Sequence, residues 1–358
     1  MNKPARAIAI IFLTCWLLLA AAQPAVSDAE QPTMPTGQGV SMLIAAFDNS
    51  QPLTSIMGWP VLSADGRYVA YSTYSDYLGA GDNNNGISDV YLFDRETLKT
   101  ILVSRAVGGG APLDEGSHSP QISEDGRYIA YGSRSSNIVS NDDNETHDIF
   151  IFDRVNGVTD LVSGNLDGQA AGSNDGPVIS DNGLVVAFGS PYANLVENDT
   201  NQIPDIFVLD RGTNKIERVS VSTSGEQSNN YNWLYAISGD GRHILFSSSA
   251  TNLVEGAGPG SDLFIHDRVS KTTTIAHYDM DGNPVEDEGH SIHNVRRRMS
   301  FDGRYVVIMS KKSRIVENDT NDVADIFILD VEDGWAKRVS VTSTGNENPY
   351  PSGFPNIS

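Results

Sequence analysis

The sequence predicts an all-β protein built from one repeated unit, on three observations. First, a Ser-x-Asp-Gly-Arg motif or a close variant occurs five times, beginning at Ser63, Ser123, Ser180, Ser238 and Ser300. Second, each copy is accompanied by short runs rich in β-branched and aromatic residues, which are typical of strands. Third, no window shows a sustained apolar period of 3.6 residues, so we expect no helix in the repeats.

Each repeat contains four such runs. One precedes the motif serine, one follows the motif directly, and a third begins with an aspartate (Asp89, Asp148, Asp205, Asp262 or Asp325). The fourth ends in Val-Ser in four repeats and in Ala276-His277 in the other. Four runs separated by Asp, Asn, Gly and Ser clusters predict an antiparallel meander, and its repetition predicts a β-propeller of four-stranded antiparallel blades. The Asp-Gly pairs of the motif supply positive-φ residues for a tight hairpin, so we interpret them as structural.

We assign residues 40–358 to the propeller, with five complete repeats. Fragments at residues 40–44 and 353–358 resemble the end of a preceding repeat and the start of a following one. Two alternatives stay open. Either the propeller has five blades with surplus ends, or it is a six-bladed type whose sixth blade is incomplete.

The repeats also resemble a known family. The pattern S-x-D-G-R-[YH]-[VI], followed by D-[IV]-[FY]-[IVL]-x-D-R, is similar to the PD40 (WD40-like) repeats of TolB-type propellers, over residues 40–358. The resemblance implies the propeller fold and favours the six-bladed type. It does not select a function, because such propellers host binding proteins, peptidase accessory domains and lyases. TolB proteins carry an α/β domain before the propeller, whereas only the short segment 28–39 precedes it here, which argues against a role in the Tol-Pal system.

The N-terminus has the pattern of a secretory signal peptide. Lys3 and Arg6 precede an apolar stretch over residues 7–22, and small residues follow. We assign residues 1–27 to a signal peptide and residues 28–39 to a linker. The alternative is an uncleaved anchor, although the stretch is shorter than the roughly 20 residues that a spanning helix needs. We therefore expect a periplasmic or extracellular protein with no transmembrane span after cleavage, and with no disulfide because the single cysteine, Cys15, lies in this segment.

Composition and motifs argue against several classes of function. The 358 residues contain 24 Lys and Arg against 46 Asp and Glu, a formal net charge of −22. An acidic surface is unsuited to nucleic acid and to anionic lipid. The sequence contains no nucleophile elbow, zinc-protease motif or P-loop. We therefore favour a binding module over an enzyme.

The loops between the second and third runs have the spacing of a cation site. Oxygen-bearing side chains stand at positions 1, 3 and 7 of three loops, and a similar set ends at Asp89 in the first repeat, as Ca²⁺ requires. The candidate ligands are Asp82, Asn85, Asp89, Asp142, Asn144, Asp148, Asp199, Asn201, Asp205, Asp319, Asn321 and Asp325. The fourth repeat lacks the pattern. The alternative is that these residues form Asx turns that start the third strand.

Basic and aromatic residues near the fourth and fifth repeats are candidate ligand-binding groups. They are Arg296, Arg297, Arg298, Lys311, Lys312, Tyr231 and Trp233. The cations suit an acidic saccharide or a carboxylate, and the rings could stack on sugars or peptide side chains. The alternatives are that the cations neutralise the neighbouring acidic residues 286–288 and that the rings are buried at the channel mouth.

The sequence thus favours a secreted or periplasmic, non-enzymatic propeller. We expect it to bind a protein or a glycan through the face with the long loops, where binding residues concentrate on rigid scaffolds, with Ca²⁺ as a candidate stabilising ion. The alternative is a polysaccharide-active, lyase-like enzyme. The resemblance to oligogalacturonate lyases implies a metal held by histidines for that alternative, for which His290, His293 and His118 are candidates, beside the basic cluster. A structural cell-surface component is the third possibility.

Overall fold

The computed structural model describes residues 56–74, 86–110, 112, 115–173, 176–285, 298–352 and 357, and of residues 56–59 only the backbone. The predicted signal peptide (1–27), the linker (28–39) and the fragment 40–44 lie outside these ranges, as do residues 353–356. All named elements within the described ranges are β-strands, as the sequence predicts. None of the described residues belongs to a helix that could cross a membrane.

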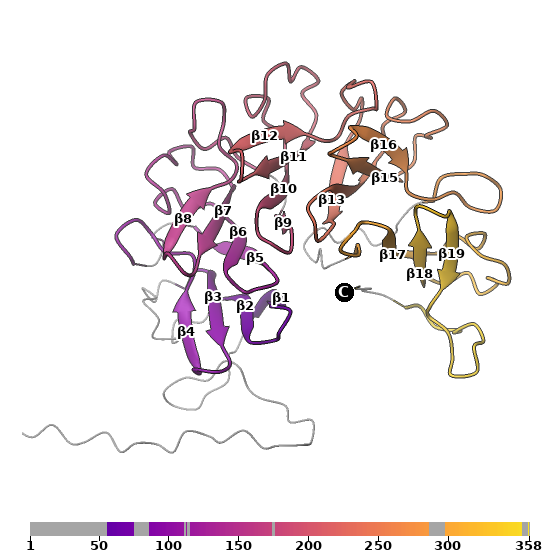
Figure 1. The fold of residues 1–358 in the computed structure, drawn as a ribbon, viewed down its shortest axis with the longest axis horizontal. Helices are drawn as coiled ribbons and strands as arrows, with labels where there is room; N and C mark the ends of the chain where they lie inside the picture. The colour runs from indigo at the N-terminus through magenta and orange to yellow at the C-terminus, as the bar shows by residue number, and fades with distance from the viewer. Residues whose placement is uncertain are drawn as a thin grey trace, which may run out of the picture. The chain divides into compact units, whose positions relative to one another are not determined.

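The strands form five antiparallel sheets in which neighbours in sequence are neighbours in the sheet (Figure 1). We number the sheets blades 1 to 5 in chain order. Blade 1 contains β1 (Ile56–Leu62), β2 (Tyr68–Thr73), β3 (Asp89–Asp94) and β4 (Lys99–Leu102). Blade 2 contains β5 (Ser117–Ile122), β6 (Tyr128–Ser133), β7 (Asp148–Asp153) and β8 (Val158–Leu161). Blade 3 contains β9 (Val178–Ile179), β10 (Val185–Ser190), β11 (Asp205–Asp210) and β12 (Lys215–Arg218).

The last two sheets repeat the same meander. Blade 4 contains β13 (Asn232–Ile237), β14 (His243–Ser248), β15 (Asp262–Asp267) and β16 (Thr272–Ile275). Blade 5 contains three named strands, β17 (Tyr305–Ser310), β18 (Asp325–Asp330) and β19 (Trp335–Arg338). Its first strand is represented by a single bridge between Met299 and Val306. The five predicted repeats are therefore five sheets, while the question of a sixth blade falls on residues outside the described ranges.

Four apolar clusters hold the blades together, and each draws its residues from two successive blades. Between blades 2 and 3, for example, Ala130 and Ile149 of one sheet pack with Phe188 and Phe207 of the next. The other clusters join blades 1 and 2, 3 and 4, and 4 and 5. Successive residues of a strand point to opposite faces, so both faces are covered and the middle strands carry apolar residues on both faces. Repeated meanders packed face to face make the fold a β-propeller.

The motif serine and the acceptor two residues later, an aspartate in four blades and Asn182 in blade 3, close the first hairpin of each blade. In blade 2 the Ser123 hydroxyl donates to Asp125 (2.6 Å) and accepts the backbone N–H of Tyr128 (2.9 Å). The side chain of Arg127 donates to both carboxylate oxygens of Asp153, at 3.1 and 2.8 Å. This contact with Arg127 lowers the pKa of Asp153 to about 2. The motif thus ties the first hairpin to the end of the third strand.

The same turns also join one blade to the next. Gly126 has a φ of 68°, and a Cβ there would lie 2.2 Å from the ring of Tyr68 in blade 1, so both backbone and space require glycine. Backbone hydrogen bonds then link the turns of successive blades. They run from Ala64 to Glu124 (2.9 Å), from Glu124 to Asp181 (2.8 Å), from Asp181 to Gly239 (2.9 Å) and from Asp240 to Phe301 (3.0 Å).

One buried position departs from the repeat pattern. Blade 4 has His266, 1% exposed, where the other blades have Phe93, Phe152, Leu209 and Leu329. Nδ1 of His266 lies 2.9 Å from Oγ1 of Thr273. Since the Thr273 hydroxyl donates to the carbonyl of Val221, Nδ1 carries the hydrogen. Burial lowers the pKa of His266 to about 4.

We expect the substitution His266→Leu to reduce the loss of stability in acid. The unfolded chain protonates this histidine near pH 6.5, whereas the folded chain keeps it neutral until about pH 4. The free energy of unfolding therefore falls as the pH drops from 6.5 toward 4, by up to about 3 kcal/mol from this side chain. Thermal unfolding of the parent and the variant across this range measures the effect. If the stabilities of the parent and the variant fell equally as the pH dropped, the prediction would be wrong.

Candidate functional site

The two ends of each blade carry different connections. In blade 4, Ile237 pairs with Ile244 beside the tight motif turn, whereas Asn232 pairs with Ser248 at the opposite end. The long loop 249–261 leaves from that second end, and the crossover 219–231 arrives there. This is the long-loop face on which the sequence places the candidate residues.

A buried aspartate at the start of the third strand organises this face. In blade 3, Asp205 accepts the Ser220 hydroxyl (2.5 Å) and Nδ2 of Asn232 (3.3 Å), while Ser220 Oγ accepts the backbone N–H of Ile206 (3.0 Å). The equivalent pairs are Asp89 with Ser104, Asp148 with Ser163, and Asp325 with Ser340. The serine of the Val-Ser ending of the fourth run therefore donates a hydrogen bond to the aspartate that begins the third run.

Blade 4 departs at both places together. His277 stands at the position of the serine, and Asp262 accepts the backbone N–H of Gly258 at 2.8 Å. The glycine-rich loop of the fourth repeat thus supplies a backbone donor to its aspartate. Blade 4 therefore lacks both the cation spacing in its loop and the serine at the end of its fourth run, and the two differences concern the same aspartate.

In blade 3 an arginine lies between the predicted calcium ligands. Nη1 of Arg218 is 3.2 Å from Oδ1 of Asp199 and 3.6 Å from Oδ2 of Asp205. Asn201 donates through Nδ2 to Asp205 (3.0 Å) and to the carbonyl of Ser228 (3.0 Å). All three charged side chains are at least nine-tenths buried. The guanidinium supplies the positive charge that these carboxylates need.

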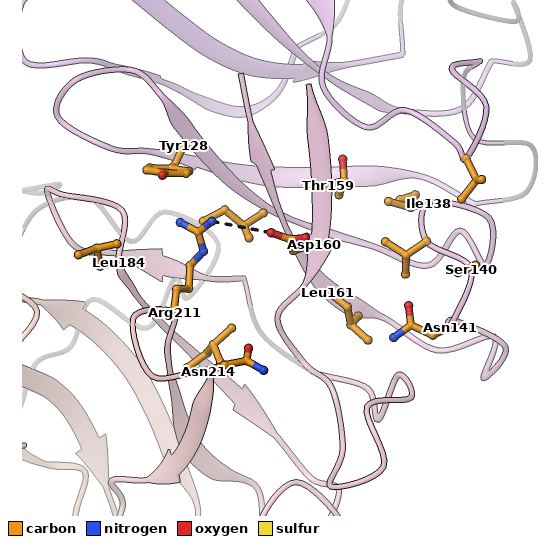
Figure 2. Close-up of a pocket in the computed structure, with 14 residues that line it drawn as sticks. Tyr128, Ile138, Ser140, Asn141, Thr159, Asp160, Leu161, Leu184, Arg211 and Asn214 are labelled. Atoms are coloured by element: carbon orange, nitrogen blue, oxygen red, sulfur yellow. Dashed lines mark ion pairs between the residues drawn. The ribbon is translucent and has the colours of Figure 1, made fainter. Parts of the chain in front are cut away.

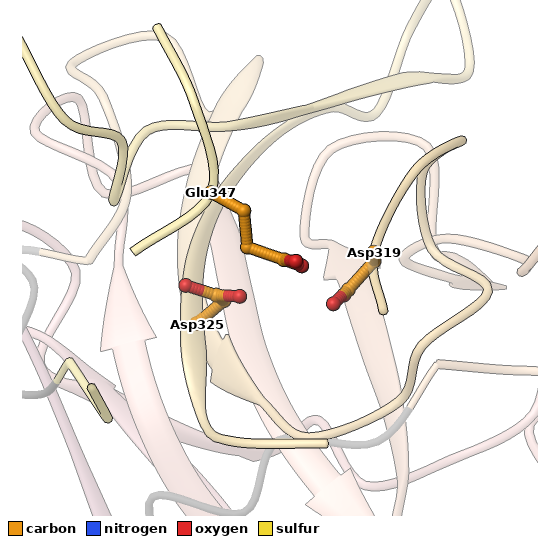
Figure 3. A group of neighbouring side chains, drawn as sticks. All are labelled: Asp319, Asp325 and Glu347. Carbon is orange, nitrogen blue, oxygen red and sulfur yellow. The ribbon is translucent and has the colours of Figure 1, made fainter. Parts of the chain in front are cut away.

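Blade 5 repeats this arrangement with one more acid. Figure 3 shows the carboxylates of Asp319, Asp325 and Glu347 pointing toward one another. Nη1 of Arg338 lies 3.2, 3.5 and 2.6 Å from them. Burial raises the pKa of Asp319 to about 6, while hydrogen bonds from Thr320 lower that of Glu347 to about 2. Because a protein cation already occupies this acidic group, we assign no metal ion to it.

The sequence interpretation missed both arginines. They lie at the end of the outer strand, at the position of Leu102, Leu161 and Ile275 in the other blades. Aligning the fourth run of all repeats would have exposed the pattern, since arginine occurs there only in the third and fifth. We therefore carry the calcium prediction forward for loop 142–148 alone. In the first loop, Asp82 and Asn85 lie outside the described residues, and Asp89 accepts the Ser104 hydroxyl at 2.9 Å.

The predicted basic cluster is engaged by the protein wherever it is described. Arg298 is buried, with its guanidinium 5.2 Å from the ring centre of Tyr235. Lys312 donates through Nζ to the carbonyl of Pro284 at 2.9 Å, and Lys311 also has a partner in the chain. Arg296 and Arg297 lie outside the described residues, as do His290 and His293. Arg298 thus contacts an aromatic ring of the chain, and Lys312 contacts a backbone carbonyl of the chain.

The predicted aromatic residues do come together. The rings of Tyr231 and Trp233 stack with their centres 6.1 Å apart and their planes 28° apart. Tyr231 is 56% exposed, whereas Trp233 packs partly into the cluster between blades 4 and 5. The pair stands at the start of β13, at the end of the blade that bears the long loops.

A second histidine pair lies on the same face. The rings of His118 and His147 stack with their centres 4.8 Å apart. Burial lowers the pKa of His147 to about 3, so that this imidazole is neutral at physiological pH. His118 Nδ1 lies 3.1 Å from the Ser119 hydroxyl. The two rings face each other in parallel, which does not direct both toward one metal ion.

A cavity of about 730 Å³ is lined by residues of blades 2 and 3 and by Val107 of the crossover between blades 1 and 2. Figure 2 shows the residues that line it. Arg211, after β11, lies on its wall 3.8 Å from Asp160 of β8. Ile138, Leu161 and Leu184 add apolar surface. None of the residues predicted to bind a ligand or a metal lines this cavity, although Asn141 and Leu161, next to the candidate loop 142–148, do.

Comparison with known proteins assigns no function. No family model and no curated protein matches the sequence. TolB from Acinetobacter baumannii is 16% identical with a TM-score of 0.44, over 79% of this chain and 53% of that one. A putative TolB from Agrobacterium tumefaciens is 15% identical with a TM-score of 0.45, over 78% of this chain and 79% of that one. An oligogalacturonate lyase in complex with manganese is 14% identical with a TM-score of 0.43, over 81% and 68%. This chain thus spans about half the length of the first of these proteins.

We expect Arg218→Leu to destabilise the protein strongly. Leucine stands at the equivalent position in blade 2, so the side chain suits the strand, but the variant leaves Asp199 and Asp205 buried without their cation. Breaking a buried ion pair in this way costs about 3–5 kcal/mol. Lys215→Leu, an exposed cation on the same strand, is the matched control and should change stability by less than about 0.5 kcal/mol. Urea unfolding curves compare the two, and equal losses would contradict the role of Arg218.

Proposed function

We propose that this propeller is a non-enzymatic binding module that works outside the cytoplasm. It binds a protein or a glycan at the long-loop end of blade 4, where Tyr231 and Trp233 stack. The observation that carries the proposal is this exposed aromatic pair on a rigid strand. The predicted signal peptide over residues 1–27 supports the location.

The backbone holds Tyr231 in place. Its carbonyl accepts the Ser248 hydroxyl (2.9 Å) and the N–H of Ser249 (3.2 Å), and its own N–H donates to the Asn230 side chain (2.9 Å). A residue whose backbone is fixed in this way, and whose ring stacks on Trp233, loses little conformational entropy when a partner covers it. Exposed aromatic surface is also unfavourable in water. Tyr and Trp are accordingly enriched in the residues that dominate binding energy at interfaces.

Polar side chains around the pair form an ordered rim. Asn229 donates through Nδ2 to Thr251 Oγ1 (3.1 Å) and accepts the Thr251 backbone N–H (3.0 Å). Asn252 accepts the N–H of Asn229 (3.1 Å) and donates to the carbonyl of Gln227 (2.8 Å). These bonds join the crossover before β13 to the loop after β14. An apolar centre with a polar rim is the usual anatomy of a binding patch.

The polysaccharide-active alternative receives no specific support. Of its candidate histidines, His290 and His293 lie outside the described residues, and the ring of His118 stacks on that of His147. The described cations proposed for it, Arg298, Lys311 and Lys312, have partners within the chain. We therefore develop only the binding function.

We expect Tyr231→Ala to weaken partner binding at least tenfold with little loss of stability. The ring is exposed, so its removal takes away contact area without opening the core. Full-length protein would be screened on an array of bacterial and plant polysaccharides and against extracellular proteins by cross-linking. Affinity for each partner found would then be measured for the parent and the variant.

Phe301→Ala is the matched control for this experiment. Phe301 is also an exposed aromatic residue, at 61%, but it lies in the motif turn of blade 5, on the opposite face. We expect the control to bind as the parent does. Equal affinity of the parent and Tyr231→Ala for the same partner would refute the proposed surface, and so would an equal loss in both variants.

A further inference from the structure

Loop 142–148 of blade 2 offers an oxygen atom at every second position. Asp142, Asn144, Thr146 and Asp148 stand at positions 1, 3, 5 and 7. The Asn144 side chain accepts the N–H of Thr146 (2.9 Å), and the Thr146 hydroxyl lies 3.4 Å from Oδ2 of Asp148. The loop therefore folds around its own polar side chains. Carboxylate, amide and hydroxyl oxygens at these spacings are the ligands that Ca²⁺ prefers.

Asp142 is the observation that points to a ligand. The residue is only 5% exposed, and neither carboxylate oxygen has a hydrogen-bond partner among the described residues. A buried carboxylate without a partner is costly unless a cation compensates its charge. Within blade 2, the described part of the chain supplies no ion pair to this group.

The equivalent loops of blades 3 and 5 differ from loop 142–148 at two positions that bear on cation binding. The position facing the loop is Leu161 in blade 2 but an arginine in each of the other two. Position 5 is Thr146 in blade 2 and an apolar residue, Ile203 or Val323, in the others. Among these three loops, the two with the arginine lack the extra oxygen and the one without the arginine has it, while blade 1, with Leu102 and Ile87 at these positions, has neither.

The asparagine at position 3 also differs between blade 2 and blades 3 and 5 in its hydrogen bonds. In blades 3 and 5, Nδ2 of Asn201 and of Asn321 donates to the aspartate at position 7, at 3.0 and 3.2 Å. Nδ2 of Asn144 is buried and has no hydrogen-bond partner among the described residues. The backbone geometry is nevertheless shared, since the residue at position 4 has a positive φ in all three loops (Glu145, Gln202 and Asp322). The three loops therefore share this turn, whereas the residue before position 1 has a positive φ in blades 3 and 5 (Asn198 and Asn318) and not in blade 2.

We propose that blade 2 binds one calcium ion through Asp142, Asn144, Thr146 and Asp148, and that Arg218 and Arg338 replace this ion in blades 3 and 5. Two carboxylates balance one divalent cation, whereas a guanidinium serves the loops that lack a fourth side-chain oxygen. Ca²⁺ suits this loop better than Mg²⁺ because it accepts a flexible set of six to eight oxygens, which water or carbonyl groups complete.

Calcium uptake by the full-length protein tests the proposal. After removal of metal with EDTA, isothermal titration with CaCl₂ gives the number of ions bound per chain. We expect Asp142→Asn to bind one ion fewer than the parent. Asp199→Asn is the matched control, because it changes the same loop position in blade 3, where Arg218 lies, and it should bind as many ions as the parent. Equal uptake by the parent and Asp142→Asn would overturn the proposal.

Leu161→Arg tests the second half of the proposal and remains informative if Asp142→Asn folds poorly. The new arginine would copy Arg218, so we expect this variant to bind one ion fewer and to melt at a higher temperature than the parent in EDTA. The melting temperature of the parent should rise by about 5 °C in excess Ca²⁺, and the rise should be smaller for Leu161→Arg. An unchanged calcium response in Leu161→Arg would overturn the proposal, as would uptake of Mg²⁺ without uptake of Ca²⁺.

Discussion

A buried carboxylate at the start of each third strand is the constraint around which the long-loop face is built. An ionised aspartate removed from water must be compensated by hydrogen bonds or by a cation. The chain supplies the hydrogen bonds in one way wherever the fourth run ends in Val-Ser, as in the pair of Asp205 and Ser220. Blade 4 uses a backbone N–H from Gly258 to Asp262 instead. The requirement is constant, while the donor varies.

Charge compensation also explains where the cations of an acidic protein are placed. Arg218 and Arg338 are buried between carboxylates on the long-loop face, and Arg127 holds Asp153 at the other end of a blade. Arg298 lies over the ring of Tyr235. These four arginines are therefore engaged by groups of the chain itself.

Local patterns in the sequence were sufficient to predict the blades. The motif serines and the third-strand aspartates mark hydrogen bonds that close over a few residues or between adjacent strands, as between Ser123 and Asp125. The small hairpin within each described crossover, such as the bridge of Val221 with Gln227, was not predicted. A polar residue three positions before a glycine, as in Ser222 and Gly225, is the signal that could have indicated it.

The candidate site was harder to predict because its decisive contacts join distant parts of the repeat. Arg218 ends the outer strand and contacts Asp199 in the loop before the neighbouring strand β11, so no local motif contains both. The sequence shows the charge of Arg298 but not the ring of Tyr235 beneath it. The stacking of Tyr231 on Trp233 could have been predicted from the sequence, since alternate residues of a strand lie on one side of the sheet. Residues close in sequence were predictable, and partners from other strands were not.

The apolar clusters between blades have a consequence for how the molecule loses its structure. Because each cluster belongs to two blades, the burial that stabilises one sheet is shared with its neighbours. Such a chain behaves like a row of coupled units, in which stability is a sum over nearest-neighbour interfaces. A lesion in one blade then weakens the two interfaces beside it more than those farther along. Unfolding should accordingly spread from interface to interface, with the pair of blades, rather than the single sheet, as the smallest cooperative unit.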